Sequence, residues 1–177
     1  MKRRDLCGVL LLLVYLLGVG LVTGPSLYQL LVWRFPSPRL EFIPFADIIS
    51  VLMDTTTPGA GAFTNIVGNL VLLLPLGFLL PLFWRYFDSA KRTIMFSAGL
   101  SLSIELIQLI AGGVTSVDDL ILNTAGAAIG FVMAKLLLRA CPRLMPRCVR
   151  STEQVYPFAC WVAVLAFYTL SDWIFLR

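Results

Sequence analysis

Hydrophobic residues gather into five long runs along the chain, and polar residues are concentrated between them. The runs cover about residues 6–23, 63–84, 93–112, 117–138 and 155–176. A helix that crosses the hydrocarbon core of a bilayer uses roughly 20 residues, so each run is long enough to span it. The pattern predicts an all-α fold, a polytopic membrane bundle of five transmembrane helices that forms a single domain over residues 1–177.

Composition agrees with this pattern and excludes other classes of protein. Hydrophobic residues make up 59% of the 177 residues and charged residues only 14%, with a mean hydropathy of +0.88. Soluble domains are usually about 45–50% apolar and about 25% charged. A soluble globular enzyme, a disordered chain and a disulfide-stapled secreted module are therefore excluded. The first run follows Lys2, Arg3 and Arg4, as in a signal peptide, but no clear cleavage site follows it, so we expect a retained helix.

The distribution of Lys and Arg predicts the orientation of the chain. If the N-terminus is cytosolic and the five helices alternate in direction, 11 of the 14 basic residues fall on the inner side. The other three, Arg34, Arg39 and Arg177, fall on the outer side. Short cytosolic loops carry such an excess of Lys and Arg, so we expect an N-in, C-out topology.

The outer stretch between the first two runs contains a second apolar region, residues 42–53. It is too short to span a membrane and too apolar for a free loop. We expect it to form an interfacial or re-entrant outer segment between helices 1 and 2 that packs over the outer mouth of the bundle.

Glu105 lies within the third hydrophobic run, where an ionisable group is unusual. A carboxylate at the centre of a membrane helix costs about 2.5–3.5 kcal/mol to insert, so such residues normally face the protein interior and mark function. Ser101 and Gln108 lie four residues before Glu105 and three residues after it, on the same face of a helix. This face requires polar partners on other helices.

Two other runs supply polar partners at a matching depth. Asn65 and Asn69 lie four residues apart in the second run, as do Asp119 and Asn123 in the fourth. At 1.5 Å per residue, Asn69, Glu105 and Asn123 each lie about 9–11 Å from the outer end of their helix. We therefore predict an outward-facing polar pocket in the outer leaflet. Its predicted ligand-binding residues are Asn65, Asn69, Ser101, Glu105, Gln108, Asp118, Asp119 and Asn123.

A purely structural cluster, in which a protonated Glu105 bonds to Asn69, Gln108 or Asn123, is the alternative interpretation. Interhelical hydrogen bonds contributed only about 0.6 kcal/mol on average in one membrane protein. An ionisable carboxyl is not needed for so small a stabilisation, which favours the functional pocket.

Two backbone features predict how the helices pack. Gly126 and Gly130 form a Gly-xxx-Gly pair that allows a neighbouring backbone to approach closely. Pro75 lies in the middle of the second run and has no N–H to donate to the Val71 carbonyl, so we expect a kink there.

Several kinds of chemistry lack the residues they need. The chain contains no His, which removes the commonest general base and metal ligand. The four cysteines are not spaced like a zinc site, so we predict no metal and no cofactor. The basic stretch 139–150 suits a topology determinant that touches anionic lipid, and no nucleic-acid-binding motif accompanies it.

Three short motifs resemble the hallmarks of the VanZ-like family. The first is NIVGNL at 65–70 followed by LPLGF at 74–78, the second is IELIQ at 104–108, and the third is DDLILNTAG at 118–126. FIPF at 42–45 resembles a fourth, weaker element, and the resemblance covers about residues 40–138.

The resemblance implies a bacterial protein that crosses the cytoplasmic (inner) membrane several times. The family's namesake is associated with low-level resistance to the glycopeptide teicoplanin, and relatives are implicated in tolerance of lipoglycopeptides. One departure concerns residues 111–117, where the family commonly has an Arg and this chain has no basic residue. A phosphate-binding role would then need Arg34 or Arg39.

Three functions from different classes are compatible with these residues. The first is a non-enzymatic envelope protein whose pocket binds an amphiphile: a membrane lipid head group, a lipoglycopeptide or a lipid-linked cell-wall precursor. The second is a membrane enzyme that modifies a lipid or such a precursor, with Glu105 as acid/base and Asp119 assisting. The third is a proton-coupled transporter or flippase, which would need to form an oligomer because the chain has no internal repeat.

Overall fold

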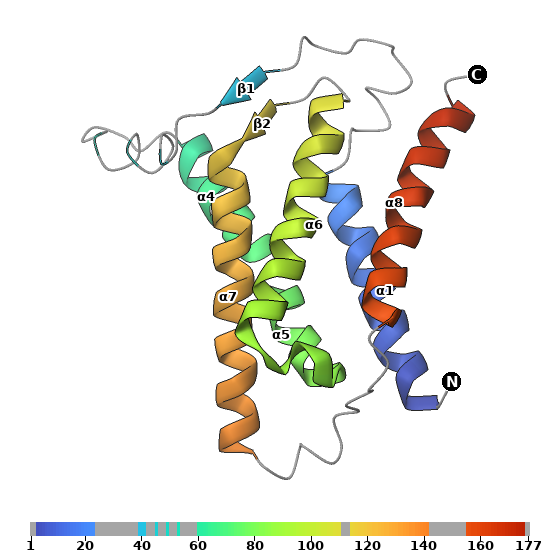
Figure 1. The fold of residues 1–177 in the computed structure, drawn as a ribbon. Helices are drawn as coiled ribbons and strands as arrows, with labels where there is room; N and C mark the ends of the chain where they lie inside the picture. Colours follow the sequence, from blue (N-terminus) through green and yellow to red (C-terminus); the bar gives the residue numbers. More distant parts are fainter. Residues whose placement is uncertain are drawn as a thin grey trace.

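A computed structural model describes residues 3–23, 39–41, 45, 49, 53, 60–110, 114–141 and 155–175. Within these residues the chain forms five helical units, as predicted (Figure 1). The units are α1 (Arg3–Thr23), α4 (Ala60–Leu72) continued by α5 (Leu74–Phe83), α6 (Ala90–Ile110), α7 (Val117–Ala140) and α8 (Val155–Phe175).

Three of these units are long and apolar enough to cross a membrane: Leu6–Thr23, Phe63–Phe83 and Val117–Ala140. The described part of α8 is apolar over the shorter stretch Tyr156–Phe167. α6 combines the length of a span with Glu105, Gln108 and several serines, which lower its apolar character. Many large apolar side chains on the outside of the bundle are exposed, as suits helices surrounded by lipid.

The second unit is broken at Leu73, in the middle of the span Phe63–Phe83. Leu73 leaves the helical conformation (φ −101°, ψ 3°), and Pro75 lies in the first turn of α5, where its missing N–H is tolerated. The Gly77 N–H donates to the Leu73 carbonyl at 3.1 Å, which restarts the helical pattern. The kink predicted at Pro75 is therefore present as a division into α4 and α5.

α7 packs against α4 and α5 with almost no side-chain volume between the backbones. A Cβ added at Gly126 would lie 1.9 Å from the Leu70 carbonyl oxygen, and one at Gly130 would lie 2.0 Å from that of Leu74. On the opposing helix, a Cβ at Gly77 would lie 1.9 Å from the Ala127 carbonyl oxygen. The predicted Gly-xxx-Gly contact is thus observed, and α5 contributes a third glycine to it.

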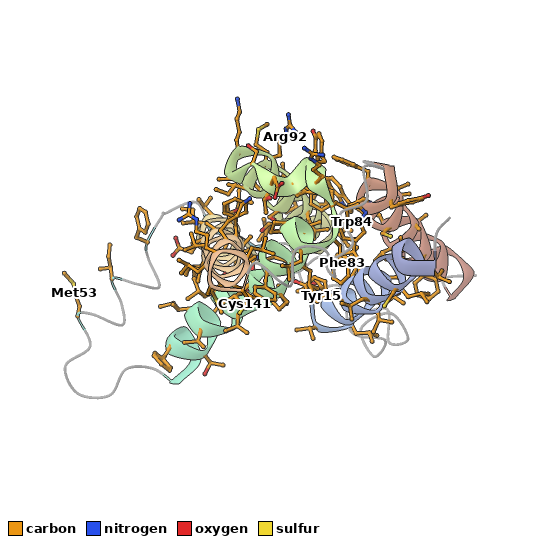
Figure 2. The ribbon with its side chains drawn as sticks, turned by 90° about the horizontal axis from the view of Figure 1, so that it is seen from below. Tyr15, Met53, Phe83, Trp84, Arg92 and Cys141 are labelled. Atoms are coloured by element: carbon orange, nitrogen blue, oxygen red, sulfur yellow. The ribbon has the colours of Figure 1, made fainter. Side chains whose placement is uncertain are left out.

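α1 and α8 lie side by side and cover the other side of α5 and α6 (Figure 1). Apolar side chains of all four helices form the core between them. Seen from below, Tyr15 lies on the side of α1 that faces the other helices, and Arg92 lies at the edge of the bundle (Figure 2). The Tyr15 hydroxyl donates to the Leu72 carbonyl at 2.5 Å. It thereby satisfies a backbone group at the break between α4 and α5.

The end of the bundle that is predicted to face the cytosol is closed by the 3-10 helix η1 (Arg85–Asp88). Phe87 is fully buried there against the rings of Phe96 and Phe158. Asp88 pairs with Lys135 of α7 at 2.9 Å. These contacts tie the start of α6 to α7 and α8.

The opposite end carries a short parallel pair of strands, β1 (Arg39–Glu41) and β2 (Val114–Ser116). Leu40 is in register with Thr115, which ties the stretch after α1 to the junction of α6 and α7. The start of α1 and the end of α8 lie at opposite ends of the bundle (Figure 1), as an N-in, C-out chain requires. The side of the membrane on which each end lies stays a prediction.

Most of the predicted interfacial segment 42–53 lies outside the described residues. Phe45, Ile49 and Met53 are described, and all three are exposed. The Ile49 N–H donates to the Phe45 carbonyl at 2.8 Å, and Met53 lies away from the helices (Figure 2).

Candidate functional site

A pocket of about 680 Å³ lies at the strand-bearing end of the bundle, between the end of α1 and the side of α4. Four of the predicted site residues line it: Asn65, Asn69, Gln108 and Asp119. The other lining residues are Val22 and Thr23 of α1 and Thr64, Gly68 and Leu72 of α4. Three helical units and the end of a fourth therefore meet around one polar cavity.

The inner wall of the pocket is a hydrogen-bonded cluster of two amides and a carboxylate. Asn65 and Asn69 lie one turn apart on α4, so both face the first turn of α7. The Asn65 Nδ2 donates to Asp119 Oδ1 at 3.1 Å, and the Asn69 Nδ2 donates to the same oxygen. The Asn69 Nδ2 also donates to Asn65 Oδ1 at 3.2 Å. Asp119 lies near the N-terminus of α7, where the helix dipole favours negative charge.

Acceptors in the wall determine which way the amides point. A carboxylate and a carbonyl only accept hydrogen bonds, so an amide beside either must present its NH₂ group. Asn69 therefore directs its NH₂ at Asp119, and Gln108 donates its Nε2 to the Thr23 carbonyl at 2.9 Å. The Gln108 Oε1 is buried and has no partner among the described residues. The unused hydrogen-bonding capacity of Asn69 and Gln108 is thus mainly on their oxygens.

Glu105 lies behind the pocket instead of lining it. Its side chain is only 4% exposed, and its Oε2 accepts the Ser116 N–H at 3.1 Å. The Thr115 hydroxyl donates to the Glu105 carbonyl at 3.0 Å. Glu105 therefore supports the junction between β2 and α7, from which Asp119 extends.

Asp118 is also buried outside the pocket. Ser116 caps α7, since its hydroxyl accepts the Asp118 N–H at 3.2 Å. The Asp118 Oδ1 accepts the backbone N–H of Phe45, which has a left-handed conformation (φ 66°). The first acid of the DDLILNTAG motif thus holds the outer segment, and the second faces the pocket.

Ser101 and Asn123 form a separate buried pair between α6 and α7. The Asn123 Nδ2 donates to Ser101 Oγ at 3.1 Å. Neither side chain lines the pocket, and the Asn123 Oδ1 has no partner within the described chain.

The predicted site residues thus fall into three separate groups: the pocket wall, the junction at Ser116 with Glu105 and Asp118, and the Ser101–Asn123 pair. The prediction omitted Thr23, whose backbone carbonyl orients Gln108. Its position at the end of the first run was the only available signal, because a backbone acceptor has no signature in the sequence. Among the described residues there is no group of three or more His, Cys, Asp or Glu that could hold a metal.

A family comparison explains why the three motifs occur together. The model of the VanZ/LLP1 family matches residues 7–138, which is more than half of the chain. The chain belongs to the VanZ/LLP1 family. The VanZ/LLP1 match runs from α1 to the last turn of α7 and includes every residue of the pocket wall, whereas α8 follows it.

VanZ/LLP1 membership and the apolar helices together identify a membrane protein. Membership is also consistent with a link to glycopeptide resistance. No curated protein and no solved structure matches the chain.

Proposed function

We propose that this VanZ/LLP1 protein resides in the bacterial cytoplasmic membrane and binds the polar head of an amphiphile, such as a membrane lipid, in the pocket between α1 and α4. Sequestration of an amphiphile at this site would contribute to glycopeptide resistance. The observation that carries the proposal is a polar pocket wall beside apolar helix surface, at the end of the bundle predicted to face outward.

An amphiphile suits both parts of this site. The wall offers the side chains of Asn69, Gln108 and Asp119 to a polar group. Val22 lines the same pocket and is 77% exposed, and its neighbour Leu21 is almost as exposed. A head group against the amides would leave an acyl chain along this apolar flank of α1.

The hydrogen bonds of the wall favour a head group rich in donors. Both N–H groups of the Asn69 amide are engaged within the wall, and Gln108 donates to Thr23. The Asn69 oxygen remains to accept, whereas the Gln108 oxygen is buried, so hydroxyl or ammonium groups fit this wall better than an unprotonated phosphate oxygen. This agrees with the absence of a basic residue from positions 111–117.

No specific contact favours the enzymatic alternative. Glu105, the predicted acid/base, is buried against the Ser116 N–H and does not line the pocket. Reaction chemistry at Glu105 would require that junction to open.

Gly68 offers a direct test, because it lines the pocket and a Cβ there would meet no atom within 4 Å. Gly68→Leu should fill the pocket without disturbing the helix. Gly18→Leu is the matched control, since Gly18 of α1 is equally open and does not line the pocket. Native mass spectrometry of protein extracted with its lipids should show bound lipid for the wild type and Gly18→Leu, and at least tenfold less for Gly68→Leu.

Teicoplanin susceptibility of cells that express the three proteins should follow the same order. Equal lipid retention and equal protection by Gly68→Leu would refute the proposal. Recovery of a chemically altered lipid would favour the enzyme instead.

A further inference from the structure

α6 carries a row of polar residues at a spacing of four, and the proposed pocket accounts for none of them. Thr93, Ser97 and Ser101 are 0% exposed and Glu105 is 4% exposed. We call these four residues the α6 polar row. It extends from the start of α6 beside η1 to the Ser116 N–H at the other end. Over 12 residues this is about 18 Å of helix, more than half of a hydrocarbon core.

Two polar atoms near the middle of the row have no hydrogen-bond partner among the residues that the structure describes. They are Ser97 Oγ and Asn123 Oδ1, on side chains that are 0% and 1% exposed. Ser97 differs in this respect from Ser103 of the same helix, whose hydroxyl donates to the Gly99 carbonyl at 2.8 Å. Buried polar groups nearly always have partners, and where protein supplies none an internal water commonly does.

We propose that the α6 polar row binds a file of water molecules and conducts protons between Glu105 and the η1 end of the bundle. Successive members of the row are four residues apart, a rise of about 6 Å. A water that bonds to two hydroxyls at about 2.8 Å each, at its tetrahedral angle, spans about 4.5 Å, so each step takes one or two waters. Hydroxyls and water both donate and accept, as proton relay requires.

The ends of the row determine how a proton enters and leaves. Of the elements around Glu105, α7 carries Asp118 and Asp119 in its first turn, and β1 carries Arg39 and Glu41, the latter in register with Ser116. The described parts of α4, α5 and β2 contain no ionisable residue, and Tyr15 of α1 is bonded to the Leu72 carbonyl. At the other end the Thr93 hydroxyl donates to the Phe87 carbonyl of η1 at 2.9 Å.

The relay conserves protons at every step. Glu105 gives its proton to the adjacent water, each hydroxyl or water accepts one proton and releases another, and one proton leaves beside Thr93. The Glu105 carboxylate is reprotonated by water from the pocket side when the junction at Ser116 opens. This path requires no ligand in the pocket, so it is independent of the proposed function.

Proton flux into vesicles tests the path directly. Full-length protein is reconstituted in liposomes that contain a pH-sensitive dye, and an inward proton flux is driven by a valinomycin-clamped potassium gradient. Wild-type protein should acidify the vesicles faster than protein-free liposomes. Ser97→Ala and Glu105→Gln should each lower the protein-dependent rate at least tenfold. Ser103→Ala removes a hydroxyl outside the row and should leave the rate unchanged.

Size-exclusion chromatography of each variant before reconstitution separates loss of flux from loss of folding. If Ser97→Ala is poorly folded, Ser101→Ala interrupts the same row one turn away and should give the same loss. A wild-type rate equal to that of protein-free vesicles would overturn the proposal. A folded Ser97→Ala or Ser101→Ala variant that conducts like the wild type would also overturn it.

Discussion

The contact between α4 and α7 differs sharply at its two ends. At Gly126 the backbones touch, and the Leu70 carbonyl occupies the space that a side chain would need. Two turns earlier on α7, the helices are connected by the side chains of Asn65, Asn69 and Asp119 around a pocket. The close contact fixes the depth and register of the two helices.

The largest expected effect on stability comes from adding a side chain at the tight end, where the backbones of α4 and α7 touch. Gly126→Ala would place a Cβ 1.9 Å from the Leu70 carbonyl oxygen, and backbone atoms cannot rotate away. We expect a loss of stability at or above the upper end of the roughly 1–3 kcal/mol typical of overpacking. Because the register would shift, bound lipid should also be lost.

Thermal size-exclusion chromatography in detergent measures the first effect, and native mass spectrometry measures the second. Gly18→Ala is the control, because its Cβ meets no atom within 4 Å. A Gly126→Ala variant with the Tm of the wild type would show that α7 can move away from α4 without loss of stability. The two ends of the contact would then be independent.

The next effect comes from the polar end. Asp119→Ala removes the acceptor shared by Asn65 and Asn69. Polar groups left without partners cost about 1–3 kcal/mol where they are buried. Because both amides are partly accessible from the pocket, we expect a loss near the lower end of that range.

Bound lipid should fall much more than stability, since the wall that holds the head group is disrupted. Thr124→Ala is the control on the same helix, because its hydroxyl only bonds to the Leu120 carbonyl of the preceding turn. If Asp119→Ala unfolds the protein as fully as Gly126→Ala, the pocket cluster stabilises the fold as strongly as the glycine contact. The distinction between the two ends would then be lost.

Substitutions at Glu105 test the junction behind the pocket. Glu105→Gln retains an oxygen that can accept the Ser116 N–H, so stability and lipid retention should change little. Glu105→Leu leaves that N–H without an acceptor, at a cost of about 1–3 kcal/mol. Hydrogen exchange at Ser116 should therefore accelerate in Glu105→Leu and remain slow in Glu105→Gln. Equal protection in both variants would show that Glu105 does not support α7.

The sequence predicted the tight end of this contact better than the polar end. The five helical units follow from apolar runs of about 20 residues, and the kink and the close contact follow from Pro75, Gly126 and Gly130. The spacing of polar residues indicated Asn65, Asn69 and Asp119, which line the pocket, but the depth argument also selected Glu105 and Asn123, which do not. These features depend on periodicity along one helix, which a single sequence displays.

The partners of those polar groups could not be predicted in the same way. Glu105 bonds to the Ser116 N–H, and Gln108 bonds to the Thr23 carbonyl. Both partners are backbone groups, which every residue has, so no residue type marks them. The pairing of β1 with β2 involves only three residues on each side and is too short to produce an alternating pattern.

The smallest expected effect lies at the other end of α7, where Lys135 pairs with Asp88 at 2.9 Å. Both side chains are about 30% exposed, and such ion pairs contribute only about 0–1 kcal/mol because water and salt screen them. Lys135→Met removes the ion pair and the ammonium group that lies 5.4 Å from the centre of the Phe131 ring, and should lower the Tm only slightly, with lipid retention unchanged. A double-mutant cycle with Asp88→Asn isolates the pair itself. A coupling above about 2 kcal/mol would exceed the range for exposed pairs and approach the cost of breaking a buried one. The ion pair would then stabilise the inner end of α7 about as strongly as the glycine contact stabilises its middle. Of these three contacts, the one at Asp119 would be the weakest.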